Sequence, residues 1–99
     1  MALPKLPKGI RFIKGKGSKK YTAIMPDGRK VSFGHIAYEH YKDRVPIRLG
    51  GKIWSHRDHG DKERMKRYHK RHSKQMCKDG RYCYKIKYTP SWFSYYFLW

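Results

Sequence analysis

The sequence predicts a small α+β domain, and three observations support this prediction. Residues 21–33 alternate in the manner of a β-hairpin, residues 61–76 have the charge order of a helix, and the chain ends in a cluster of aromatic residues. A chain of 99 residues can build one hydrophobic core but not two. We therefore expect a basic arm at residues 1–18 and a single small domain at residues 19–99.

The composition is dominated by positive charge. The chain has 25 Lys and Arg against 7 Asp and Glu, a formal net charge of +18. Such a domain repels itself unless a polyanion or an acidic protein surface neutralises it. Aromatic residues make up 16% of the chain, and their large burial per residue favours a folded domain over disorder. These numbers predict a folded protein with an anionic partner.

The first 20 residues are rich in Pro, Gly and Lys and contain no acid. Proline and glycine disfavour both a helix and a central strand. The sequence therefore predicts that residues 1–18 form an arm, which is either solvated or in contact with an anion.

Residues 21–33 have the pattern of a hairpin. Tyr21, Ala23 and Met25 alternate with Thr22 and Ile24, and Asp27–Gly28 supplies residues that favour a turn. The alternation resumes at 31–33. The hairpin then carries cations beside its turn and its entry, away from the buried face.

Residues 34–60 have the least regular pattern. The piece 34–43 fits a short helix or a strand, and residues 55–61 fit a loop. Residues 45–54 fit two short extended pieces around the Gly50–Gly51 pair, which predicts a second hairpin.

Residues 61–76 predict the central helix. Asp61 and Glu63 stand in its first turn and Lys and Arg follow, an order that suits the helix dipole. With 3.6 residues per turn, one face collects apolar and imidazole side chains and the rest of the surface is cationic. The residues of the inward stripe are Met65, Tyr68, His69, His72 and Met76.

The end of the chain carries most of the large apolar side chains. Residues 81–88 alternate as a half-buried strand does, and Thr89 and Pro90 suit the cap and first residue of a short helix. A helix this short is unstable alone in water, so it needs to pack on the domain. Its predicted inward side chains are Trp92, Phe93, Tyr96 and Trp99.

The order of these segments resembles a known viral family. The chain has KKYTAIMPDGRKVSFG at 19–34, HYKD at 40–43, HGDKERMKRYHKRH at 59–72 and a final LW. This arrangement is similar to that of small basic proteins encoded by nucleocytoplasmic large DNA viruses, among them phycodnaviruses, iridoviruses, marseilleviruses and mimiviruses. The resemblance spans residues 19–99, with 45–54 as an insertion. It implies a viral source and assigns no chemistry.

The cations predict a polyanion-binding surface, because Lys and Arg along a helix can neutralise successive phosphates. The chain has no motif that reads bases in a DNA groove. The candidate residues are Lys14, Lys16, Lys19, Lys20, Arg29, Lys30, Arg64, Lys66, Arg67, Lys70, Arg71 and Lys74.

Two functions fit this surface. The first is a non-enzymatic structural protein of the virion, a minor capsid or inner-shell component, with capsid proteins or viral double-stranded DNA as partners. The second is a sequence-nonspecific DNA-binding or condensing protein that is not fixed in the capsid. Both place the protein in the virion or, during assembly, in the host cytoplasm or nucleus.

Catalysis, cofactors and small-molecule substrates are not indicated. The acids are few, and no spacing suggests a nucleophile with an oriented base. The longest apolar stretch is far shorter than the roughly 20 residues of a membrane-spanning helix.

The histidines and cysteines match no tight zinc pattern. The spacings are His56-x2-His59, His69-x2-His72 and Cys77-x5-Cys83. Two cysteines are too few for a disulfide framework, and the start of the chain lacks a secretory signal, which favours a reducing compartment. The sequence leaves open whether the cysteines pair or bind a metal.

Overall fold

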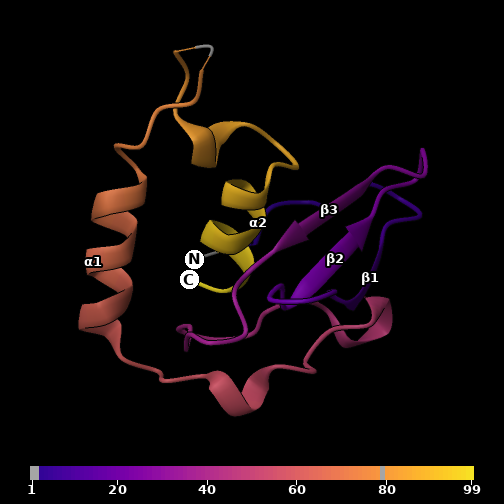
Figure 1. Ribbon diagram of the computed structural model, residues 1–99, viewed down its shortest axis with the longest axis horizontal. Coiled ribbons are helices and arrows are strands. Elements are labelled where there is room, and N and C mark those ends of the chain that lie inside the picture. The colour runs from indigo at the N-terminus through magenta and orange to yellow at the C-terminus, as the bar shows by residue number, and fades with distance from the viewer. Residues whose placement is uncertain (1–2, 79) are drawn as a thin grey trace.

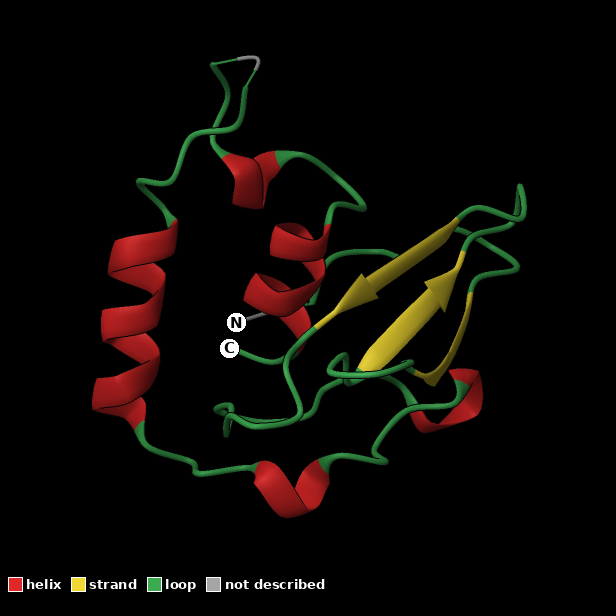
Figure 2. Cartoon of the chain, in the orientation of Figure 1, coloured by secondary structure: helices red, strands yellow, loops and turns green. Residues whose placement is uncertain are grey.

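The computed structural model describes residues 3–78 and 80–99 and shows the predicted α+β class (Figures 1 and 2). A three-stranded antiparallel sheet in the order β1-β2-β3 is followed by two helices. The elements are β1 (Arg11–Lys14), β2 (Tyr21–Ile24), β3 (Lys30–Phe33), α1 (Lys62–His72) and α2 (Pro90–Phe97). Among the described residues, no helix has the length and hydrophobicity needed to cross a lipid bilayer.

The predicted hairpin is confirmed as β2 and β3. Tyr21 pairs with Phe33 and Ala23 with Val31, so the alternating residues share the inner face. At the turn, the Asp27 carboxylate accepts a hydrogen bond from the Arg29 backbone N–H at 3.0 Å. Gly28 has a φ of +89°, a conformation that glycine adopts without strain.

The expectation of an arm at residues 1–18 is wrong for its second half, because residues 11–14 form β1 of the sheet. β1 pairs with β2, with Phe12 opposite Ala23. Ile10 and Phe12 are buried in the core and Ile13 is exposed. Proline and glycine weaken the strand pattern only up to Gly9, and residues 10–14 then alternate in and out. The radius of gyration, 13.0 Å, matches the roughly 13 Å of a compact 100-residue domain.

Helix α2 closes the core, and its start is as predicted. The Thr89 hydroxyl accepts a hydrogen bond from the Trp92 backbone N–H at 3.2 Å, and Pro90 is the first helical residue. Phe93 stacks on Phe33 with ring centroids 5.0 Å apart, which joins the helix to the sheet. Trp92 and Phe93 are fully buried, whereas the predicted inward residues Tyr96 and Trp99 are half-buried.

Helix α1 begins as predicted but ends earlier. The Asp61 carboxylate accepts hydrogen bonds from the backbone N–H groups of Glu63 and Arg64, which satisfies two otherwise unpaired donors. The helix ends at His72, and the expectation that Met76 belongs to its inward stripe is wrong, because Met76 lies beyond the helix and is 56% exposed. The other stripe residues are half-buried.

The second hairpin predicted at 45–54 is absent from the described structure. Short 3-10 helices occupy Ile47–Leu49 and Ser55–Arg57 instead. The glycine pair serves close packing, since a Cβ on Gly50 would lie 2.1 Å from the Phe12 carbonyl oxygen. Gly50 also has a φ of +101°. The glycine therefore lets this segment approach the backbone of β1.

The strand predicted at 81–88 is also absent among the described residues. Tyr82 makes one isolated bridge to Met76, and a 3-10 helix follows at Cys83–Lys85. The backbone of residues 81–83 makes hydrogen bonds to residues 75–77, and a disulfide bond between Cys77 and Cys83 closes this loop. The pairing that the sequence left open is therefore present, in contrast to the expected reducing environment.

Phe12 tests the place of β1 in the core. Replacing Phe12 with Ala should lower the free energy of unfolding by about 3–5 kcal/mol, because it leaves a cavity among packed aromatic rings. Urea denaturation measures the change. Ile13→Ala is the matched control, since Ile13 is the next residue of β1 and is 44% exposed. Equal losses in the two variants would contradict the burial of β1.

Candidate polyanion interface

Four of the predicted cations surround a groove on helix α1. The groove encloses about 310 Å³ and is lined by Arg64, Arg67, Lys70, Arg71 and Trp99. The cations fall on one side of the helix because they are spaced by three and four residues. Arg64 and Arg71 are about 10 Å apart along the axis, from the rise of 1.5 Å per residue.

Trp99 forms the aromatic wall of this groove, a position that the sequence pattern did not indicate. Its ring stacks on Tyr68, with centroids 4.3 Å apart and planes at 5°. The His59 ring lies 5.1 Å from the Trp99 ring. These contacts dock α1 against the end of the chain. The one sequence signal was that Tyr68 and Trp99 both belonged to predicted inward faces.

The acidic residues are mostly engaged in holding the fold. Asp61 caps α1, and Asp43 and Asp58 accept hydrogen bonds in the interior. Glu39 pairs with Arg64, the two charged atoms lying 3.3 Å apart. In residues 3–78 and 80–99 this is the one ion pair made by a cation of α1. The groove therefore keeps a strongly positive potential.

The remaining candidate cations lie outside the groove. Figure 1 shows α1 and the β2–β3 turn at opposite sides of the molecule. Lys66 is exposed elsewhere on α1, and Lys74 follows the end of the helix. The other exposed candidates lie on the strands and turns of the sheet, and they are Lys14, Lys16, Lys19, Arg29 and Lys30.

The prediction that Lys20 belongs to the polyanion-binding surface is wrong, because its side chain is buried. It is 1% exposed, and its ammonium donates to the Tyr38 carbonyl oxygen and contacts His40 Nδ1, both at 2.6 Å. Burial, followed by the positive charge of Arg57, lowers the pKa of Lys20 to about 8. The pattern of alternation in the hairpin did not reveal that a lysine would precede β2 in the interior.

Lys20, His40 and Asp58 form a chain of hydrogen bonds. His40 Nε2 lies 2.6 Å from Oδ1 of the Asp58 carboxylate. The same oxygen accepts a hydrogen bond from the Asp43 backbone N–H at 2.8 Å. Burial is the main cause that lowers the pKa of His40. These are residue types that move protons in enzymes, and here His40 is 0% exposed and Lys20 1%, so both side chains are almost closed to solvent. Their separations in the sequence gave no signal of this contact.

Tyr21 and Asp43 make a second buried contact. The Tyr21 hydroxyl donates to the Asp43 carboxylate, which also accepts the backbone N–H groups of Val45 and Trp54 at 3.1 and 3.0 Å. Burial and the Asp43 hydrogen bond raise the pKa of Tyr21. The carboxylate is therefore satisfied without an arginine or lysine partner.

The candidate zinc ligands are used otherwise. Cys77 and Cys83 are bonded to each other, and the His72 ring stacks on Tyr68 at 3.9 Å. The described part of the chain has no group of three or more His, Cys, Asp and Glu that could hold a metal ion.

Comparisons with known proteins give no relative for this chain. No protein-family model matches it, and no curated protein or solved structure shows significant similarity.

The buried histidines predict a dependence of stability on pH. Burial is the main cause that lowers the pKa values of four of them below the ordinary 6.5, namely His40, His59, His69 and His72. As pH falls through about 6.5, the unfolded chain takes up protons that the folded chain resists. The free energy of unfolding should therefore fall with acidification.

Urea midpoints measured between about pH 7.5 and 5.5 follow this change, with high ionic strength held constant to screen the added surface repulsion. A midpoint that stays level or rises on acidification would show that these histidines are not held neutral by the fold.

Proposed function

We propose that this protein is a non-enzymatic structural protein of a large DNA virus particle and that the groove on α1 binds the phosphates of the genome. The observation that supports it best is the convergence of Arg64, Arg67, Lys70 and Arg71 on one groove. Arginine and lysine so placed release counterions when they contact successive phosphates. The resemblance to proteins of large DNA viruses supplies the setting.

The groove favours a duplex over a single strand. Proteins that bind single strands stack bases on free aromatic faces. The Trp99 ring is instead stacked on Tyr68 and faces His59. Without base stacking, the groove can contact the phosphates of the backbone, and such contacts are independent of base sequence. We therefore propose sequence-nonspecific contact with double-stranded DNA.

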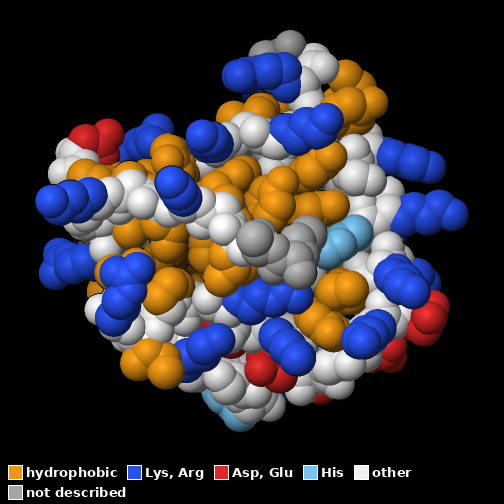
Figure 3. Space-filling view, turned by 180° about the vertical axis from the view of Figure 1, so that it is seen from behind, with side chains coloured by type: hydrophobic (Ala, Val, Ile, Leu, Met, Phe, Trp, Pro, Cys, Tyr) orange, Lys and Arg blue, Asp and Glu red, His pale blue; other side chains and the backbone are white. Residues whose placement is uncertain are grey.

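A second surface favours attachment in a shell over a freely diffusing DNA-condensing protein, which is the alternative. Figure 3 shows hydrophobic side chains gathered on one face with Lys and Arg around them. Two clefts that share Pro4 and Lys5 are lined by exposed or half-buried apolar side chains such as Leu3, Leu6 and Tyr96. Apolar surface with a basic rim suits an acidic protein partner, and the charge of +18 opposes a second copy.

Binding to random-sequence duplex DNA across a salt series tests the proposal. The logarithm of the affinity should fall linearly with the logarithm of salt concentration. Arg67→Gln/Arg71→Gln should reduce the slope by about two units, because it removes two phosphate contacts. Fluorescence anisotropy with a labelled duplex measures both slopes.

Arg29→Gln/Lys30→Gln is the matched control, since it removes the same charge from the opposite side of the molecule. Its slope should stay near that of the unchanged protein. Equal effects of the two pairs would refute a localised interface. Weak binding of the unchanged protein near physiological salt would assign the cations to an acidic protein surface instead.

A further inference from the structure

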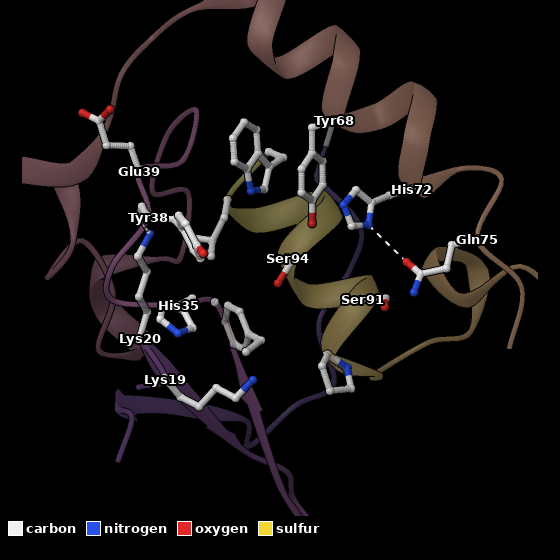
Figure 4. Close-up of a pocket in the computed structure, with 15 residues that line it drawn as sticks. Lys19, Lys20, His35, Tyr38, Glu39, Tyr68, His72, Gln75, Ser91 and Ser94 are labelled. Carbon is white, nitrogen blue, oxygen red and sulfur yellow. Dashed lines mark hydrogen bonds between the residues drawn. The ribbon is translucent and has the colours of Figure 1, made fainter. Parts of the chain in front are cut away.

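A cavity distinct from the α1 groove lies where the sheet meets the two helices. It encloses about 330 Å³ between the start of β2, residues 33–39, the end of α1 and helix α2. Figure 4 shows side chains from all four segments around it, with the Lys19 ammonium and the Ser94 and Tyr68 hydroxyls directed toward the space between them. Its volume is in the range of small-molecule sites, roughly 300–1,000 Å³.

The polar groups of the cavity are mainly hydrogen-bond donors. In the part of the chain that the structure describes, the Lys19 side chain makes no ion pair. His35 Nδ1 accepts the Ala37 backbone N–H at 3.1 Å, so the neutral ring carries its proton on Nε2. Ser91 and Ser94 add hydroxyls from α2, and Tyr68 adds one from α1. Lys19, His35 and these hydroxyls can all donate to an anion.

Negative charge is scarce around this cavity. Glu39 is the one acid that lines it, and its carboxylate lies 3.3 Å from the Arg64 guanidinium. Figure 4 shows Glu39 at the margin of the cavity, pointing away from Lys19. Lys20 also lines the cavity, and its ammonium, which donates to the Tyr38 carbonyl oxygen, adds positive charge there. The electrostatic balance therefore favours an anion over a cation.

The rest of the lining is apolar. Trp99 and Pro90 contribute the accessible apolar surface, because Phe33 and Leu98, which also line the cavity, are each only 1% exposed. A ligand that matches both parts joins a small anionic group to an apolar or aromatic body. A phosphate monoester presents three strong acceptor oxygens, which suits this number of donors better than a carboxylate with two.

We propose that this cavity binds a small phosphate monoester with an aromatic body, such as a nucleoside monophosphate or the terminal nucleotide of a nucleic acid. Lys19 and His35 hold the phosphate, and the hydroxyls of Ser91 and Ser94 complete its contacts. The aromatic body lies against the edge of Trp99. The site takes a terminal phosphate, whereas the α1 groove takes the internal phosphates of a duplex.

Titration of the full chain with AMP, adenosine and inorganic phosphate, followed by NMR, tests this proposal. AMP should bind about tenfold more tightly than adenosine, because a charge-assisted contact is lost with the phosphate. The shifts should lie at Lys19, His35 and Ser94. Equal affinity for AMP and adenosine, or shifts confined to α1 between Arg64 and Arg71, would overturn the proposal.

Lys19→Ala should weaken AMP binding about tenfold. Lys16→Ala is the matched control, because Lys16 is an exposed lysine of the same turn that does not line the cavity. Lys19 is exposed, so its loss should leave the fold intact. Ser91→Ala is the second variant and should also weaken AMP binding. Equal effects of the two lysine variants would overturn the assignment.

The two sources of the phosphate are separated by duplexes with a 5′-phosphate or a 5′-hydroxyl. A preference for the 5′-phosphate that Lys19→Ala abolishes identifies a nucleic-acid end, and AMP binding without that preference identifies a free nucleotide. Arg67→Gln/Arg71→Gln should leave AMP binding unchanged. This site and the α1 groove can therefore fail separately.

Discussion

The buried Asp43 carboxylate is the contact on which the middle of this protein depends. It is 2% exposed, and an unpaired charge at that depth costs several kcal/mol. Tyr21 and the backbone N–H groups of Val45 and Trp54 satisfy it. Because Tyr21 belongs to β2, the carboxylate ties the irregular segment 34–60 to the central strand. The Lys20–His40–Asp58 chain adds a second tie, to the residue just before that strand.

The acids that hold the fold are not available to pair with most of the surface cations. Asp27 and Asp61 hold a turn and a helix start, and Asp43 and Asp58 hold the interior. Few carboxylates remain to neutralise 25 basic residues. The net charge of +18 is itself set by the composition, whatever the acids contact. A polyanionic or acidic partner lowers the resulting repulsion.

The Tyr68–Trp99 stack places the two proposed sites next to each other. Trp99 lines both the α1 groove and the cavity, and Tyr68 lines the cavity. The stack joins α1 to the end of the chain. The two proposals, internal phosphates in the groove and a terminal phosphate in the cavity, therefore concern neighbouring surfaces that share Trp99.

Local sequence patterns were sufficient to predict the elements whose stabilising contacts lie within a few residues of one another. The hairpin, the Asp61 cap of α1 and the Thr89–Pro90 start of α2 each depend on residues a few positions apart, and the sequence predicted them correctly. The α1 cations were also readable, because their helical spacing is local. The remaining elements depend on partners far away in the chain.

The tertiary structure alone decided where β1, Lys20, Trp99 and the Gly50–Gly51 pair belong. Lys20 meets His40, Phe12 meets Ala23, and Gly50 meets Phe12 only after the chain has folded back on itself. Lys20 is buried despite the ordinary preference of lysine for the surface, because the Tyr38 carbonyl oxygen and His40 Nδ1 contact its ammonium. The sequence by itself determined the fold class and the excess of positive charge. Long-range packing determined which cations line one groove at the surface, because the partners of each side chain depend on how distant segments pack together.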